Sequence, residues 1–191
     1  MRTYRCLGRN EFFENGLRLV PIRDEDKNLL MKWRNEQIHH LRQAAPLTPE
    51  SQEKYFKEVI SPLFEKDKPG QLLFSLLKDE SCIGYGGLVH MNWIDHHAEV
   101  SFLMDTSLQA EYFDTFWSSF LRMISQVAFT ELGFRKIFTY AFDIRPHLYP
   151  VLINAGYVQE ARLKDHCLIE GRYYDVLIHS LFNPNDHLQK S

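Results

Sequence analysis

Four residues in the middle of the chain have side chains that could hold a metal ion or move a proton: His90, Asp95, His96 and His97. Their spacing matches no structural zinc pattern, and no paired cysteines lie nearby to complete one. A turn rich in polar residues accounts for Asp95, His96 and His97 without a metal ion. The sequence therefore predicts no metal site, and it leaves His97 as a candidate base for a proton transfer.

A second group of chemically useful residues, Trp33-Arg34-Asn35-Glu36, ends a predicted helix. An aromatic ring, a guanidinium and an amide at one helix end can line a pocket for an acceptor molecule through stacking, charge and hydrogen bonding. The same run also fits a core tryptophan followed by a solvated helix terminus, which composition alone favours. The next loop adds further candidates for the same pocket: His39, His40, Arg42 and Gln43.

The composition of the whole chain limits what these residues can belong to. Of its 191 residues, 45% are hydrophobic and 25% charged, which suits one globular domain with a sizeable core. The formal net charge of −3 leaves no basic footprint for nucleic acid. No apolar run approaches the ~20 residues that span a bilayer. The three cysteines are odd in number and widely spaced, at Cys6, Cys82 and Cys167. With no apolar signal core over Met1–Cys6, these features predict a cytoplasmic protein that binds neither nucleic acid nor membrane.

Two helices are expected before the middle of the chain. Asp24 is the predicted cap of the first helix, which carries Trp33 near its end. Thr48 is the predicted cap of the second helix, because Pro49 follows at the first helical position and acidic Glu50 lies in the first turn. Ile60 is the expected last residue of that helix, since Ser61-Pro62 comes next.

Two more helices are expected in the second half. Apolar residues from Phe113 to Ala128 recur at the helical period, which predicts one long helix buried against a sheet. Leu132-Gly133 is its expected stop, because glycine favours the left-handed backbone that follows many helices. A short helix is expected to begin near Pro150 and to end at Ala155-Gly156.

The remaining segments alternate or carry turn signals and predict strands. The expected strands are Leu17–Ile22, Gln71–Leu77, Cys82–Trp93, Ala98–Met104, Lys136–Phe142, and a closing hairpin of Tyr157–Leu163 and Cys167–Phe182 through Glu170-Gly171. The resulting order β-α-α-β-β-β-α-β-α-β-β predicts a mixed α/β sheet with helices on its faces. Residues 1–16 are interpreted as an arm or an extra edge strand, 17–182 as the domain, and 183–191 as a polar, frayed tail.

This order of elements resembles the GNAT family of acyl-CoA-dependent N-acyltransferases over Leu17 to Phe182. Three stretches carry the resemblance: Cys82-Ile83-Gly84-Tyr85-Gly86-Gly87-Leu88 as the third strand of the family, Ala98-Glu99-Val100-Ser101-Phe102-Leu103-Met104 as the fourth, and Asn154-Ala155-Gly156-Tyr157-Val158-Gln159-Glu160 as the closing signature. Within the family the chain is similar to ribosomal-protein-alanine-type and amino-sugar-nucleotide N-acetyltransferases.

The resemblance implies a fold in which the fourth and fifth strands splay apart and hold the pantetheine arm of acetyl-CoA, along Phe102, Leu103 and Met104. It implies that the pyrophosphate lies at the start of the long helix, where free N–H groups favour anions. The helix residues in question are Gln109, Ala110, Glu111, Tyr112 and Phe113. Glu99 is implied as the base that takes a proton from the amine, and Trp33, Arg34 and Asn35 as acceptor-binding residues.

The sequence departs from the family at two places. The family's pyrophosphate loop has the pattern Gln/Arg-x-x-Gly-x-Gly/Ala, and here Ala110 and Tyr112 stand where glycines are expected, so the backbone loses conformational freedom there. The family's acid is a tyrosine on the short helix, where this chain has Leu152; Tyr149, one turn earlier, is the candidate substitute. Arg145 stands where the family often has asparagine and could reach a phosphate.

These observations predict an enzyme that moves an acetyl group from acetyl-CoA to a primary amine, without a metal. The expected partner is a small-molecule amine, with a nucleotide-linked amino sugar as the candidate acceptor, and the expected assembly is a monomer or homodimer. Two alternatives remain open: a binding or scaffold protein derived from the family that has lost CoA, and an acetyltransferase acting on protein or peptide N-termini.

Overall fold

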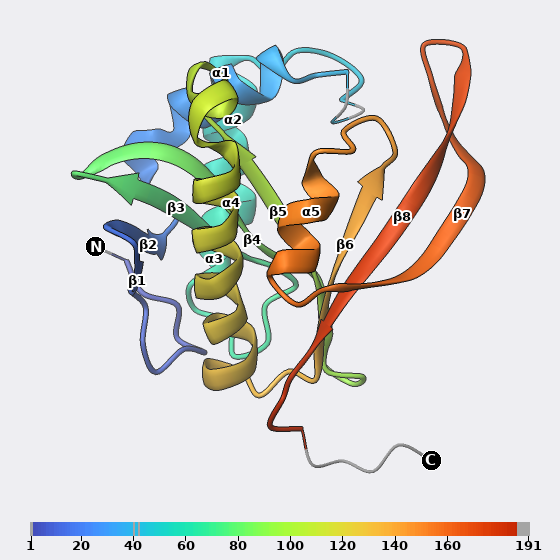
Figure 1. The fold of residues 1–191 in the computed structure, drawn as a ribbon. Coiled ribbons are helices and arrows are strands. Elements are labelled where there is room, and N and C mark those ends of the chain that lie inside the picture. Colours follow the sequence, from blue (N-terminus) through green and yellow to red (C-terminus); the bar gives the residue numbers. More distant parts are fainter. Residues whose placement is uncertain (1, 40, 42, 187–191) are drawn as a thin grey trace.

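A single mixed sheet forms the centre of the protein. The computed structural model describes residues 2–39, 41 and 43–186. The eight strands described lie in the order β1-β2-β3-β4-β5-β6-β8-β7. Their bounds are β1 Phe12–Glu14, β2 Leu17–Pro21, β3 Leu72–Lys78, β4 Ser81–Asn92, β5 His97–Met104, β6 Lys136–Phe142, β7 Val158–Ile169 and β8 Arg172–Phe182. This confirms the predicted α/β class and the predicted strands up to β6 (Figure 1). The closing hairpin turns at Glu170-Gly171 as predicted, but β7 continues past the predicted end at Leu163 to Ile169, so Cys167 belongs to β7 rather than to β8.

Strands β5 and β6 are parallel, and they pair over a short distance only. Their register joins His97 with Lys136, Ala98 with Ile137, and Glu99 with Phe138. Beyond Glu99 the described residues of the two strands no longer pair, and Figure 1 shows the strands diverging. The predicted splay is therefore present, and Glu99 lies at its vertex.

Helices cover both faces of this sheet. Their bounds are α1 Lys27–Glu36, α2 Pro49–Tyr55, α3 Ser61–Leu63, α4 Gln109–Ser125 and α5 Leu148–Asn154. Phe102 of β5 stacks on Trp117 of α4, with ring centroids 5.0 Å apart. The neighbouring position, Leu103, is paired with Tyr85, whose hydroxyl meets Arg34 of α1. Because successive strand residues point to opposite faces, α4 and α1 lie on opposite sides of the sheet.

The long helix and the short one end where glycines allow a left-handed backbone. The predicted apolar stripe forms α4 and a π-helical continuation over Gln126–Glu131. Gly133 then has a φ of 63°, and Gly156 after α5 has a φ of 87°, so both predicted stops are confirmed. None of the described helices is both long enough and apolar enough to cross a bilayer.

The second helix begins as predicted but ends later. The Thr48 side chain accepts a hydrogen bond from Ser51 N–H, with Pro49 in the first turn. The predicted end at Ile60 was wrong, because Phe56–Ile60 is a π-helical turn that leads into α3. Its Ser61 N–H donates to the Phe56 carbonyl, so the longer spacing lets the chain continue through Pro62, which has no N–H to donate.

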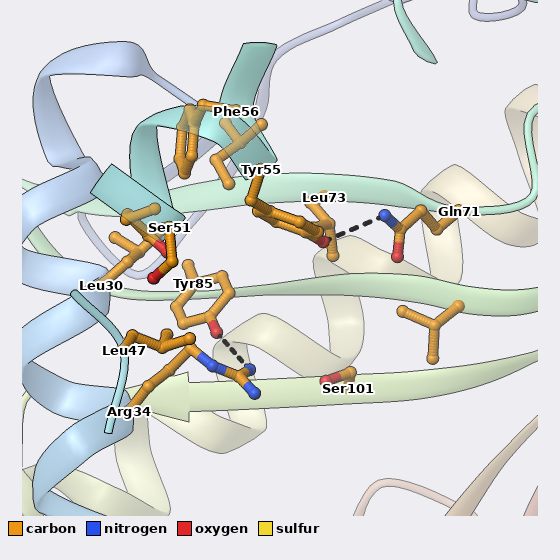
Figure 2. A pocket seen from close by; sticks show the side chains of 13 residues that line it. Leu30, Arg34, Leu47, Ser51, Tyr55, Phe56, Gln71, Leu73, Tyr85 and Ser101 are labelled. Atoms are coloured by element: carbon orange, nitrogen blue, oxygen red, sulfur yellow. Dashed lines mark hydrogen bonds between the residues drawn. The ribbon is translucent and has the colours of Figure 1, made fainter. Parts of the chain in front are cut away.

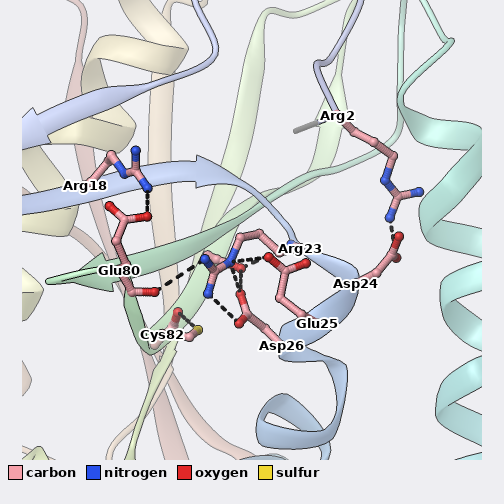
Figure 3. A network of polar contacts seen from close by, with 10 residues as sticks. Arg2, Arg18, Arg23, Asp24, Glu25, Asp26, Glu80 and Cys82 are labelled. Atoms are coloured by element: carbon pink, nitrogen blue, oxygen red, sulfur yellow. Dashed lines mark hydrogen bonds and ion pairs between the residues drawn. The ribbon is translucent and has the colours of Figure 1, made fainter.

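The predicted cap at Asp24 was also wrong. Asp24–Asp26 is a 3-10 turn, and the Asp24 carboxylate pairs with Arg2 rather than with the helix (Figure 3). The buried carboxylate is Asp26, which accepts hydrogen bonds from Ser75 Oγ at 2.6 Å and from Arg23 Nη2 at 2.7 Å. Satisfying this buried charge requires partners from β3, which a local sequence pattern does not reveal.

The described residues near each end of the chain make specific contacts with the domain. Before β1, which adds an edge strand to β2, Tyr4 stacks on Phe64 at 4.4 Å and donates its hydroxyl proton to the Leu73 carbonyl at 2.6 Å. At the other end Asn183 Nδ2 donates to the Phe134 carbonyl at 3.1 Å, so the first residue of the predicted tail contacts the domain. The rest of the predicted tail, 187–191, lies outside the described residues.

Candidate functional site

Two cavities meet at β5. The first, here called the α1–α2 cavity, has a volume of about 390 Å³ and lies between those helices and the sheet. The second, the splay cavity, has a volume of about 230 Å³ and lies between β5 and β6. Ser101 lines both cavities, and Glu99, two residues earlier on β5, lines the splay cavity. A molecule in each cavity would therefore meet the other at the vertex of the splay.

Arg34 gives the α1–α2 cavity its charge. Its Nη1 donates to the Tyr85 hydroxyl at 3.0 Å (Figure 2). Its Nε donates to Gln43 Oε1 at 3.2 Å. Burial raises the pKa of Tyr85, an effect that Arg34 opposes. Among the described residues that line this cavity, Arg34 is the one charged side chain. A cavity whose described lining carries one positive and no negative side chain is a more favourable environment for an anionic group than for a cation.

An aromatic wall faces Arg34 across the cavity. Tyr55 at the end of α2 lines the cavity and keeps 37% of its surface exposed. Gln71 Nε2 donates to the Tyr55 hydroxyl at 3.2 Å, and this holds the ring in place (Figure 2). A ring fixed at a cavity edge offers a flat surface for an aromatic base or a sugar.

The other two predicted acceptor residues have structural surroundings. Trp33 is fully buried, its indole N–H has no partner among the described residues, and it lines neither cavity. Asn35 accepts from Leu47 N–H at 2.7 Å and donates to the Leu47 carbonyl at 2.9 Å, so its amide holds the α1–α2 loop. Trp33 is therefore a core residue, as the alternative interpretation of this run predicts. Of the three predicted acceptor residues, Arg34 alone lines the cavity. His40 and Arg42 of this loop lie outside the described residues.

Three polar side chains along the splay cavity have no partner among the described residues. Trp117 Nε1 and Thr139 Oγ1 are buried without a hydrogen bond, and both residues line the cavity. Arg145 also lines it, with no carboxylate paired to it in the described part of the chain, and burial lowers the pKa of its guanidinium. Buried polar groups are almost always satisfied, so Trp117 and Thr139 fit a ligand with amide groups. The half-buried Arg145 fits an anionic group on the same ligand.

The predicted segment Phe102–Met104 divides between the cavity and the core. Phe102 lines the splay cavity beside Trp117. Leu103 and Met104 are buried and do not line it. The Met104 carbonyl accepts a hydrogen bond from Gln37 Nε2 at 3.2 Å, which ties the end of β5 to α1. The part of β5 that faces the cavity therefore lies between Glu99 and Phe102.

The start of α4 forms a broad depression of about 620 Å³. Its lining takes in four of the predicted pyrophosphate residues, Gln109, Ala110, Glu111 and Phe113, together with Thr106, Asp114 and His147. Tyr112 points elsewhere and stacks on Phe116 at 5.2 Å. None of the described lining residues is a lysine or arginine, so an anion here would depend on backbone N–H groups and the helix dipole.

Tyr149, the candidate acid, lies outside both cavities. Its hydroxyl donates to Asp143 Oδ1 at 2.8 Å, and its ring stacks on His179 at 5.2 Å. Burial raises the pKa of Tyr149, and the hydrogen bond to Asp143 raises it further. Leu152, at the position where the family has tyrosine, lines the splay cavity.

Sequence reasoning missed several of the residues that shape the site. Tyr85 and Ser101 lie within the quoted strands but were assigned no role, although alternation along β4 and β5 places both on the side of Arg34. Trp117 was assigned to the core stripe of α4, and Thr139 to an ordinary strand. No local signal distinguishes a core side chain from one that borders a cavity. In the described part of the chain no three metal-ligating side chains lie close enough to share an ion.

Comparisons with known proteins agree with this geometry. Residues 19–178 match the family model described as "Acetyltransferase (GNAT) domain". A Vibrio cholerae spermidine N-acetyltransferase in complex with CoA and spermine has a TM-score of 0.74 at 19% identity, covering 89% of this chain and 97% of that one. Mutant forms of the spermidine/spermine N-acetyltransferase from the same organism have a TM-score of 0.73 at 19% identity, covering 89% and 95%. A search of curated proteins finds no match. Because the family model spans most of the chain, the protein belongs to the GNAT acetyltransferase family.

Proposed function

We propose that the protein transfers the acetyl group of acetyl-CoA to the primary amine of a nucleotide-linked amino sugar. The observation that carries this proposal is the α1–α2 cavity, where Arg34 is the one charged group among the described lining residues. A guanidinium can bind a diphosphate in a bidentate manner, and Tyr55 offers a surface on which a base can stack. The meeting point at Ser101 supports transfer between molecules held in the two cavities.

A polyamine fits this cavity less well. The similar Vibrio cholerae structure contains spermine, a polycation, but 19% identity supports a shared fold rather than a shared acceptor. Binding several ammonium groups at once usually needs carboxylates nearby. The described lining of the α1–α2 cavity offers no carboxylate, and Arg34 would repel a cation.

The reaction requires a neutral amine, a polarised thioester and a path for the departing proton. Glu99 is the candidate base, since it lies at the vertex of the splay beside Ser101. Backbone N–H groups of β5 that β6 leaves unpaired can donate to the developing oxyanion, a contribution that is often large in acyl transfer. Tyr149 stays a prediction as the acid, and in this structure its hydroxyl proton is directed to Asp143.

The side chains of the splay cavity suit the pantetheine arm of acetyl-CoA. Trp117 Nε1–H can donate to an amide carbonyl, Thr139 Oγ1 can donate or accept, and Arg145 can bind a phosphate. At the start of α4, Glu111 and Asp114 oppose a pyrophosphate. We therefore expect CoA to bind, but more weakly than to a relative with a glycine loop.

The acceptor assignment can be tested with purified protein, acetyl-CoA and a panel of amines. The panel contains uridine and thymidine diphosphate amino sugars, spermidine, and a peptide with a free N-terminus, and the readout is free thiol together with the mass of the product. Turnover on the nucleotide sugars, at a higher kcat/KM than on spermidine or the peptide, is the expected result. Turnover on spermidine or the peptide alone would refute the assignment.

Binding of CoA is measured separately by calorimetry and thermal shift. CoA at 100 times its Kd should stabilise the fold by about 2.7 kcal/mol. The absence of both heat and melting shift at millimolar CoA would favour the binding or scaffold protein that the altered start of α4 suggests. We place the reaction in the cytoplasm, in a monomer or homodimer. The three free cysteines are compatible with that compartment.

A further inference from the structure

His90 lies beside Glu99 because β4 has a bulge. The register of β4 and β5 joins Val89 with Glu99 and resumes only at Asn92 and His97. In regular strand geometry His90 would point to the face opposite Val89 and Glu99. Instead its backbone has a φ of 48°, and its imidazole Nδ1 lies 2.8 Å from Glu99 Oε2. The extra residue of the bulge thus turns the imidazole toward the carboxylate.

This contact joins an exposed group to a sheltered one. The His90 side chain is 78% exposed, whereas the Glu99 side chain is 21% exposed and lines the splay cavity. Within the described part of the chain, His90 is the one hydrogen-bond partner of the Glu99 carboxylate. One carboxylate oxygen is therefore fixed from the side of β4, and the other is left for a ligand at the vertex.

His97, a second histidine of this region, has different contacts. His97 lies on β5 two residues before Glu99, and its ring packs against Phe138 at 5.8 Å. Its Nδ1 is buried with no hydrogen bond to any described residue, so it does not orient the Glu99 carboxylate. Lys136, paired with His97 across the strands, is directed to Glu160 at 3.0 Å. His90 alone of these groups contacts Glu99.

We propose that His90 is a positioning residue, which donates Nδ1–H to Glu99 and holds its second oxygen toward the amine at the vertex of the splay. This inference rests on the part of the proposed function that makes Glu99 the base. It is independent of the identity of the acceptor. A carboxylate that rotates freely has the orientation needed for proton transfer only part of the time. Holding the Glu99 carboxylate in that orientation should therefore raise kcat and change the KM of the substrates less.

A matched pair of variants tests the hydrogen bond. Asparagine and aspartate have the same size, and both tolerate the positive φ of this position. His90→Asn keeps an N–H near the position of Nδ1, whereas His90→Asp places a second carboxylate against Glu99. Each is made alone and with Glu99→Gln, and kcat, both KM values and the melting temperature are measured with whichever panel amine is turned over.

We expect His90→Asn to retain kcat within about threefold and His90→Asp to lose about tenfold or more, since hydrogen bonds to charged groups carry that much free energy. The KM for acetyl-CoA should change by less than about twofold, because the contact orients Glu99 without binding the cofactor. With Glu99→Gln, the aspartate should no longer lower kcat or the melting temperature.

Three results would overturn the proposal. Equal kcat for His90→Asp and the parent protein, with Glu99→Gln inactive, would show that Glu99 needs no positioning. Equal losses of kcat in His90→Asn and His90→Asp would show that His90 does not act through a hydrogen bond to Glu99. If no amine is turned over, the melting temperatures still test the contact. A fall in melting temperature caused by His90→Asp that is the same with Glu99→Gln would show that residue 90 does not contact the Glu99 carboxylate. Full activity of Glu99→Gln would instead refute the role of Glu99.

Discussion

Replacement of Arg34 is the sharpest test of which acceptors the α1–α2 cavity admits. Its guanidinium makes two hydrogen bonds, to Tyr85 and Gln43, and it is the one charge among the described lining residues. Arg34→Gln removes the charge and the hydrogen bond to Tyr85, but it keeps an amide nitrogen near the position of Nε, which donates to Gln43. A hydrogen bond between a charged group and its ligand contributes about 1.5–3 kcal/mol, which corresponds to about tenfold to hundredfold in kcat/KM. Loss of the hydrogen bond to Tyr85 costs about 1–3 kcal/mol of folding stability.

The assay measures initial rates with each substrate varied in turn, in Arg34→Gln, Arg34→Glu and Tyr85→Phe. We expect Arg34→Gln to raise the KM for the nucleotide sugar by about tenfold or more, with the KM for acetyl-CoA nearly unchanged. Arg34→Glu should lose the nucleotide sugar further and improve use of spermidine. Tyr85→Phe removes a hydroxyl partner but no charge, and it controls for altered packing. Equal changes in both KM values, or no change in Arg34→Glu, would refute the reasoning.

Three further predictions concern the base, the sheet and a buried histidine. Glu99→Gln should lower kcat/KM by about a hundredfold or more, with the largest loss at low pH, where the amine is mostly protonated. Rates measured from about pH 6 to 9 test this, and an unchanged pH profile would show that Glu99 is not the base. Gly86→Ala should destabilise the fold by about 1–3 kcal/mol, because the added Cβ would lie 2.1 Å from the Ser101 carbonyl oxygen. Thermal unfolding measures this, and Gly70→Ala is the control, because its added Cβ would have nothing within 4 Å. Burial lowers the pKa of His179 in the folded protein. As the pH falls, this histidine is therefore protonated at a higher pH in the unfolded chain than in the folded one, and the free energy of unfolding should decrease below about pH 6.5. Urea unfolding should show a shallower decline in His179→Leu, and an unchanged slope would remove His179 as its source.

Most of the fold could be predicted because its signals are local. The apolar stripe of α4 and the cap at Thr48 each depend on residues within a few positions of one another. The glycines after α4 and α5 are needed at the left-handed backbone that follows each helix. The errors came from contacts across the chain. The buried Asp26 carboxylate accepts a hydrogen bond from Ser75, which is far from it in the sequence. The helix continues beyond Pro62 because the π turn before it changes the hydrogen-bond spacing.

The site was less predictable than the fold. The resemblance pointed to Glu99 and Arg34, because both follow from the order of the elements and their place on a strand or a helix end. It did not distinguish Arg34 from Trp33, its neighbour, although a rotation of about 100° between successive helical residues sends one into the core and the other toward the cavity. The contact of His90 with Glu99 was also beyond prediction, because it depends on a bulge that reverses the alternation of β4.

The distribution of charge connects the two unusual features of this site. A family member with a glycine loop concentrates phosphate binding at the start of the long helix, where this chain has Glu111 and Asp114. The cations stand elsewhere, with Arg145 in the splay cavity and Arg34 in the α1–α2 cavity. If CoA binds as proposed, an acidic helix start would weaken its binding without changing the vertex, because the proposed reacting groups meet at β5. On the proposed assignment, an electropositive acceptor cavity would favour anionic amines over polyamines, so weaker CoA binding and a changed acceptor would be compatible with an unchanged reaction centre.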